Sequence, residues 1–216
     1  MYRVRFLLTM FIIVAAVVAL TAQDKVPGKQ TNKTKEGAPM KNGKNTAVVE
    51  TSLGTFEIEL YPADAPKTVE NFVKLTEKKY FDGMRVHRVS KGFVIQTGDE
   101  KSKDPAKSAE WGTGGQSIWG KPFEDELNPN TPSYKEGYKT GVVAMANRGP
   151  NTNTSQFFVC LRDVALPHGY TIFGKVVKGL DVVQKIGAVD IIPGQMGPTD
   201  GRPKTDVMIK KISIKK

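Results

Sequence analysis

Three polar residues embedded in apolar stretches are the side chains of this sequence best placed to do chemistry. Arg88 lies within residues 86–89 (VHRV), Gln96 ends residues 93–96 (FVIQ), and Gln156 opens residues 156–158 (QFF). A half-buried arginine must be held by hydrogen bonds or must face a ligand, because burying an unpaired charge is costly. Taken one at a time, each of the three residues fits a structural role at least as well as a functional one.

Residue types that other chemistries require are scarce or badly placed. The single cysteine, Cys160, excludes an intramolecular disulfide and is interpreted as a buried hydrophobe within an apolar run. Two histidines, His87 and His168, are too few for a histidine-rich metal site, and His87 is interpreted as structural. The glycines of residues 112–115 lack the following Lys-Ser/Thr of a phosphate-binding loop. The acidic residues 124–126 are interpreted as a solvated loop, so nothing favours hydrolysis.

Short apolar alternations predict the strands that would position these residues. Residues 47–50 and 55–60 alternate on either side of a turn at 52–54, which indicates a β-hairpin. Further strands are expected at 85–89, 93–97, 142–146, 157–161, 171–177 and 207–214. A helix is expected after Asp64 as N-cap, and a second short helix is expected around 180–186, closed by Gly187. Many strands, two helices and no βαβ rhythm predict an antiparallel barrel or sandwich.

The N-terminal residues have the layout of a targeting segment. A basic start containing Arg3 and Arg5 precedes an apolar run at 6–20, and Ala22 is a suitable last residue before cleavage. We therefore predict a signal peptide at 1–22 and an exported protein, periplasmic or secreted. An uncleaved segment that anchors the chain to a membrane is the alternative. Residues 23–45 are predicted to be a flexible Lys-rich linker, with an arm that contacts anionic envelope surfaces as the alternative.

The charge distribution argues against nucleic acid as a partner. The chain of 216 residues has a formal net charge of +10. The excess lies at the two ends and in the predicted linker, so residues 46–209 are neutral overall and carry no basic stripe. No amphipathic surplus indicates an interface, and we expect a monomer.

Several stretches of the sequence resemble those of the cyclophilin-type peptidyl-prolyl isomerases, and they occur in the same order along the chain. The matching stretches are 80–83 (YFDG), 86–89 (VHRV), 92–99 (GFVIQTGD), 112–115 (GTGG), 123–126 (FEDE), 145–153 (MANRGPNTN), 155–158 (SQFF) and 173–176 (FGKV). Together they make residues 46–216 the predicted isomerase domain, and the signal segment indicates a bacterial, exported member. The resemblance implies a mainly β fold, a closed eight-stranded antiparallel barrel capped by two α-helices.

The resemblance also implies an activity, the cis–trans isomerisation of Xaa-Pro bonds in unfolded or exported polypeptides. No bond breaks in this reaction, so it needs no nucleophile, metal or cofactor. Arg88 is the implied catalytic residue, and it would stabilise the twisted amide. The implied substrate-binding residues line an apolar proline pocket or hold the peptide backbone and orient Arg88. The pocket residues are Phe93, Val94, Phe158 and Leu166, and the others are Gln96, Ala146, Asn147 and Gln156. Tyr170 stands where cyclosporin-sensitive members have histidine.

Two segments depart from the family pattern. Residues 100–111 are longer than is usual in the family and would lie beside the active face, where they would shape substrate access. Residues 163–170 are one residue short and contain no tryptophan, so we predict weak inhibition by cyclosporin. Two alternative functions remain open at this point, a proline-peptide binding module that lacks useful catalysis and a chaperone with incidental isomerase activity.

Overall fold

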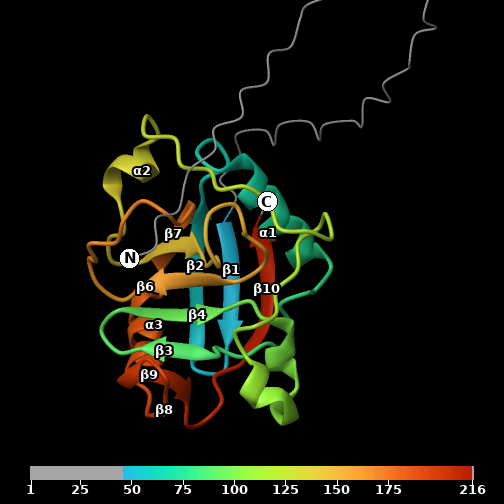
Figure 1. Cartoon of the computed structure of the whole chain (residues 1–216), viewed down its shortest axis with the longest axis vertical. Helices are drawn as coiled ribbons and strands as arrows, with labels where there is room; N and C mark the ends of the chain where they lie inside the picture. The colour runs from blue at the N-terminus through green and yellow to red at the C-terminus, as the bar shows by residue number, and fades with distance from the viewer. Residues whose placement is uncertain (1–45, 216) are drawn as a thin grey trace, which may run out of the picture. The chain divides into compact units, whose positions relative to one another are not determined.

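Ten β-strands in residues 46–215, the part of the chain that this computed structural model describes, form one antiparallel sheet (Figure 1). The predicted signal peptide and linker lie outside the described residues. The strands are β1 Thr46–Thr51, β2 Gly54–Leu60, β3 Arg88–Ser90, β4 Val94–Thr97, β5 Val142–Met145, β6 Phe157–Cys160, β7 Ile172–Lys178, β8 Ile191–Gly194, β9 Gly197–Pro203 and β10 Ile209–Lys215. Their order is β10-β1-β2-β7-β5-β6-β4-β3-β9-β8.

Five helical segments accompany the sheet. They are α1 Pro66–Glu77, the single-turn α2 Pro132–Glu136, α3 Leu180–Gly187, and the 3₁₀ helices η1 Glu100–Lys103 and η2 Pro105–Glu110. In Figure 1, α1 lies in the upper part of the domain and α3 in the lower part. These two helices are the ones that the sequence predicts, whereas α2 is additional. Within the described residues, no helix is long and apolar enough to cross a membrane.

The sheet curves into a barrel of eight strands, β10 to β3 in the order above, which confirms the predicted mainly β barrel. Among the described residues, no hydrogen-bonded ladder joins β10 to β3 to close the barrel. Instead, the backbone just before β3 bonds to the first residue of β10 and to the segment before it: Gly83 donates to Ile209 at 2.8 Å, and Val86 donates to Val207 at 2.9 Å. The β8–β9 hairpin adds two strands beside β3, and no pattern in the sequence predicts these two strands.

Period-two alternation gives the sheet two apolar faces. The inner face holds the main core, where Phe72 of α1 packs against Phe81, Phe157 and Phe173 with ring centroids 5.2–5.7 Å apart. The outer face carries a smaller cluster that includes Val94, Ala144, Phe158 and Cys160. Burial raises the pKa of the Cys160 thiol to about 12. Cys160 is therefore a buried hydrophobe, as predicted.

The start of α1 corrects two predictions. The N-cap position is Ala65, not Asp64, and Ala65 has no capping side chain. The carboxylate of Glu126 caps the helix instead, accepting hydrogen bonds from the backbone N–H groups of Lys67 at 3.0 Å and Thr68 at 2.8 Å. Asp64 accepts from the backbone of Ser133 at the start of α2. The solvated-loop interpretation of residues 124–126 is therefore wrong for Glu126.

Candidate active site

Arg88 occupies the centre of the candidate site and is held on two sides. It extends from β3, where its direct cross-strand partner on β4 is Gln96. The Gln96 Oε1 atom accepts from Arg88 Nη1 at 3.0 Å. On the other edge of the guanidinium, Asp200 of β9 accepts from Nε at 3.0 Å and from Nη2 at 2.8 Å. A buried or half-buried arginine needs such partners, and this one has a carboxylate and an amide.

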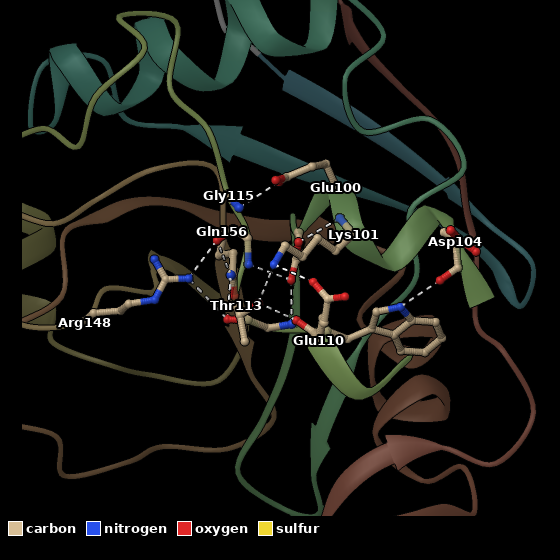
Figure 2. Close-up of polar contacts among 12 residues, drawn as sticks. Glu100, Lys101, Asp104, Glu110, Thr113, Gly115, Arg148 and Gln156 are labelled. Carbon is tan, nitrogen blue, oxygen red and sulfur yellow. Dashed lines mark hydrogen bonds and ion pairs between the residues drawn. The ribbon is translucent and has the colours of Figure 1, made fainter. Parts of the chain in front are cut away.

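A chain of amide hydrogen bonds continues from Arg88 to the glycine segment 112–115. Gln96 donates through Nε2 to Gln156 Oε1 at 3.0 Å. Gln156 in turn donates to the carbonyl oxygens of Gly112 and Gly114 at 3.0 and 2.9 Å (Figure 2). Arg148 also donates to the Gly114 carbonyl, at 2.8 Å. Because every member has a partner, the two glutamines are fixed in orientation.

Asp99 at the end of β4 holds the same glycine segment from the other side. Its buried carboxylate accepts from the backbone N–H groups of Gly112 at 2.5 Å and Gly114 at 3.1 Å. A Cβ atom at position 114 would lie 2.1 Å from Asp99 Oδ1, so this approach requires glycine there. The glycines of 112–115 therefore serve close backbone packing beside the site.

A cavity of about 680 Å³, lined by both apolar and polar residues, opens beside Arg88. Its lining includes nine of the ten residues implied by the resemblance: Arg88, Phe93, Val94, Gln96, Ala146, Asn147, Phe158, Leu166 and Tyr170. The tenth, Gln156, lines an adjoining smaller cavity together with Gln96, Ala146 and Asn147. The structure thus brings all ten residues together, although they come from five separate stretches of the chain.

Residues 163–170 form one wall of the cavity through Leu166 and Tyr170. The Tyr138 hydroxyl anchors this segment, because it donates to the Tyr170 carbonyl at 2.9 Å and accepts from the Tyr170 N–H at 3.0 Å. The Tyr170 ring meets Phe158 edge to face at 5.6 Å between centroids. Asn147 donates to the Gly169 carbonyl at 2.8 Å, which ties the same segment to the end of β5.

His87 lies in the wall of the cavity and is a poor base. Burial lowers its pKa to about 4, Asp99 opposes the shift, and the charge of Arg88 adds to it. Neither ring nitrogen has a hydrogen-bond partner in the part of the chain that the structure describes. The imidazole is therefore neutral near pH 7, which agrees with its interpretation as structural.

Several residues that the sequence did not single out also line the site. Trp111, which ends the 100–111 segment, lines the cavity, so that segment does lie beside the site as expected. Asp200 and residues 192–196 also line it, and no local pattern could have found them, since Asp200 lies 112 residues from Arg88 in a Gly- and Pro-rich stretch. Across residues 46–215, no group of three or more His, Cys, Asp or Glu side chains could hold a metal ion.

Comparisons with known proteins identify the family. Residues 46–214 match the family described as cyclophilin type peptidyl-prolyl cis-trans isomerase/CLD. The chain is 43% identical over 169 residues to peptidyl-prolyl cis-trans isomerase-like 1 of Neurospora crassa, covering 77% of this chain and 91% of the relative. The mouse peptidylprolyl isomerase domain and WD repeat-containing protein 1 is 41% identical over 172 residues, 79% of this chain, but this chain spans only 24% of that relative.

Solved structures agree with the sequence match. A cyclophilin-type peptidyl-prolyl cis-trans isomerase of Cryptosporidium parvum has a TM-score of 0.68 at 30% identity, covering 80% of this chain and 98% of its own. A second structure of that protein, determined in the presence of the dipeptide Ala-Pro, has a TM-score of 0.67 at 30% identity, with 79% and 99% covered.

An antiparallel barrel that carries an arginine on its outer face, beside a cavity partly walled by apolar side chains, has the architecture of a prolyl isomerase. The chain belongs to the cyclophilin-type peptidyl-prolyl cis-trans isomerase family, and its function is the isomerisation of peptidyl-prolyl bonds. The relatives named above are eukaryotic, so they lend no support to a bacterial, exported member.

Proposed function

We propose that Arg88 is the catalytic residue and that the neighbouring cavity grips the proline ring of a polypeptide substrate. The observation that supports this most is the placement of a firmly held guanidinium in a cavity whose wall includes the apolar side chains of Phe93, Phe158 and Leu166. Phe93, Phe158 and Leu166 would surround the proline ring. The peptide backbone would lie along Gln96, Ala146, Asn147 and Gln156, with Val94 and Tyr170 completing the walls.

The reaction requires stabilisation of a twisted amide. The Xaa-Pro bond has a rotational barrier of about 18–20 kcal/mol because amide resonance is lost on twisting. As resonance is lost, electron density returns to the prolyl nitrogen, where an N–H group of Arg88 can donate to it. A ~10⁵-fold acceleration needs about 7 kcal/mol of preferential binding of the twisted state. Hydrogen bonds from a charged group, at about 1.5–3 kcal/mol each, together with a pocket that fixes the ring, can supply this.

We further propose that the enzyme is an exported, bacterial member that acts on unfolded or exported proline-containing polypeptides. The basic start, the apolar run at 6–20 and Ala22 support a cleaved signal peptide and a periplasmic or secreted enzyme. N-terminal sequencing of the mature protein from its natural host tests this. A chain that begins at Gln23 is the expected result, and a chain that keeps the apolar run in the membrane fraction is the contrary one.

Exchange NMR on a short Xaa-Pro peptide tests the catalytic assignment. The wild type should accelerate exchange between the cis and trans signals, and Arg88→Ala should reduce the acceleration at least about tenfold, equivalent to about 1.4 kcal/mol. Arg162→Ala is the matched control, because Arg162 is exposed and does not line the cavity. A wild type that binds the peptide without accelerating exchange would favour the alternative function, a proline-peptide binding module or a chaperone.

A further inference from the structure

The β8–β9 hairpin places a carboxylate on the face of the sheet that carries Arg88. Asp200 of β9 is the direct cross-strand partner of Ser90 on β3. Cross-strand partners point to the same face, and residues two apart in a strand share a face, so Asp200 and Arg88 lie on one side. The hairpin itself is tightly built, since a Cβ atom at Gly201 would lie 2.0 Å from the carbonyl oxygen of Ile192.

The ion pair between Asp200 and Arg88 is close and largely shielded from solvent. Asp200 is 8% exposed. Both of its oxygens face the edge of the guanidinium formed by Nε and Nη2, at 2.8–3.2 Å. Burial by itself would raise the pKa of Asp200, but hydrogen bonds from Arg88 and Ser90 and the charge of Arg88 hold it below the usual value. The carboxylate therefore stays ionised wherever the protein is folded near neutral pH.

A count of N–H groups shows what this ion pair does to Arg88. A guanidinium has five N–H groups. Asp200 accepts from Nε and from one N–H of Nη2, and Gln96 accepts from one N–H of Nη1. One N–H group on each Nη atom has no acceptor among residues 46–215, and we call these two remaining donors the outer fork. Donors that are fixed before the reaction need no reorganisation when charge develops.

We propose that Asp200 is a positioning residue for catalysis: by holding the Nε–Nη2 edge, it fixes the guanidinium plane of Arg88 so that the outer fork faces the substrate. This inference rests on the proposed catalytic role of Arg88. It assigns the β8–β9 hairpin a part in the reaction, because the hairpin supplies Asp200. The opposite role would be inhibitory, with Asp200 competing with the substrate for Arg88.

The test compares Asp200→Ala, Asp200→Asn and Asp206→Asn in the full chain. Asp206 is the matched control, because it forms an ion pair with another arginine, Arg85, and does not line the cavity. From exchange NMR over a range of peptide concentrations, we expect Asp200→Ala to lower kcat at least tenfold and to change KM less than threefold. Asp200→Asn keeps one accepting oxygen and should be intermediate. Asp206→Asn should retain the wild-type kcat.

A second readout does not depend on activity. In ¹⁵N spectra, the Arg88 Nε–H signal, identified by its loss in Arg88→Ala, should exchange slowly with water in the wild type and rapidly in Asp200→Ala. An unchanged Nε–H signal, or a kcat in Asp200→Ala equal to or above that of the wild type, would overturn the proposal. A wild type that shows a protected Nε–H signal but no catalysis would instead refute the proposed function and leave the positioning intact.

A separate observation concerns the tip of the same hairpin. Met196 is 76% exposed and Ile192 is 40% exposed, yet both line the cavity that holds Arg88 and Phe93. Single exposed apolar side chains are common, but apolar side chains that are exposed and continuous with a cavity can extend a binding surface. Trp111 also lines this cavity, and its ring lies 5.9 Å from the guanidinium carbon of Arg202 in the hairpin. The hairpin and the 100–111 segment therefore meet at the cavity.

From this continuity we infer a second apolar subsite at the hairpin tip, which takes a large apolar side chain of the polypeptide beside its proline. This inference also rests on the proposed function. Peptides with Ala, Leu or Phe on either side of Xaa-Pro should differ in affinity for the wild type, with the larger residues bound at least threefold more tightly at one of these positions. Met196→Ser should remove the preference, so that all the peptides bind with equal affinity.

Val177→Ser is the control, because Val177 is 54% exposed and does not line the cavity. It should keep the wild-type preference. Equal affinities of the wild type for all peptides, or a preference that persists in Met196→Ser, would overturn the subsite. Concentration-dependent dimerisation abolished by Met196→Ser would also overturn it, since the tip would then be covered by a second copy of the chain. Absent catalysis with a retained binding preference would refute only the isomerase mechanism.

Discussion

Replacing Arg88 with lysine separates the charge of this residue from its geometry. Lysine keeps the positive charge but presents three N–H donors on a single nitrogen instead of five on a planar fork. In the wild type, three N–H groups are engaged by Asp200 and Gln96, which leaves two for the substrate. A lysine that donated to both Asp200 and Gln96 would have at most one N–H donor left for the substrate, and that donor would often not point toward the substrate.

The expected loss follows from that count. At least one hydrogen bond from a charged group to the twisted amide is removed, and such a bond contributes about 1.5–3 kcal/mol. This corresponds to a fall of about 10- to 150-fold in kcat/KM. Stability should change much less than in Arg88→Ala, because lysine still neutralises Asp200, whereas alanine leaves that carboxylate buried without its partner.

Exchange NMR on the same Xaa-Pro peptide measures kcat/KM, and urea unfolding measures the stability of each variant. We expect the order wild type, Arg88→Lys, Arg88→Ala in activity, with the lysine variant close to the wild type in unfolding free energy. Activity of Arg88→Lys within threefold of the wild type would refute the reasoning. Positive charge near the cavity would then be sufficient, and the planar fork and its two remaining donors would have no role.

Two further outcomes rest on the structure, and a third rests on the sequence. Burial lowers the pKa of His87 to about 4, against about 6.5 in the unfolded chain, so the folded protein binds a proton at His87 less readily than the unfolded chain does. The stability linked to the neutral His87 side chain is therefore fully present above pH 6.5 and is lost as pH falls toward 4. In urea unfolding, the wild type should lose about 2 kcal/mol more than His87→Gln between pH 7 and pH 5, and equal losses would contradict this. Glu126→Ala should cost about 1–2 kcal/mol by uncapping α1, while Glu124→Ala, which removes an exposed ion pair with Lys67, should leave the melting temperature unchanged. Cyclosporin should inhibit weakly, because no tryptophan lies in residues 163–170 and Tyr170 replaces histidine, and a submicromolar inhibition constant would refute that prediction.

Elements built from local patterns were predictable from the sequence. The hairpin of β1 and β2 follows from period-two alternation around a short turn, and α1 and α3 follow from apolar residues at helical spacing. The β8–β9 hairpin was not predictable, because residues 191–203 are rich in Gly and Pro and show no apolar alternation. The cap of α1 was not predictable for a different reason, because Glu126 lies far along the chain from the helix that it caps.

The residue types at the candidate site were determined by the sequence itself. Arg88, Gln96 and Gln156 stand out as polar residues in apolar strands, and the order of the surrounding motifs indicates the family. Only the tertiary structure decided how Arg88 is held, because its partner Asp200 comes from a strand 112 residues away. A hydrogen-bonded ion pair such as this one forms only when donor and acceptor atoms come within about 3 Å. That proximity depends on which strands are neighbours and in what register, and neither is set by the residues next to Arg88 in the chain.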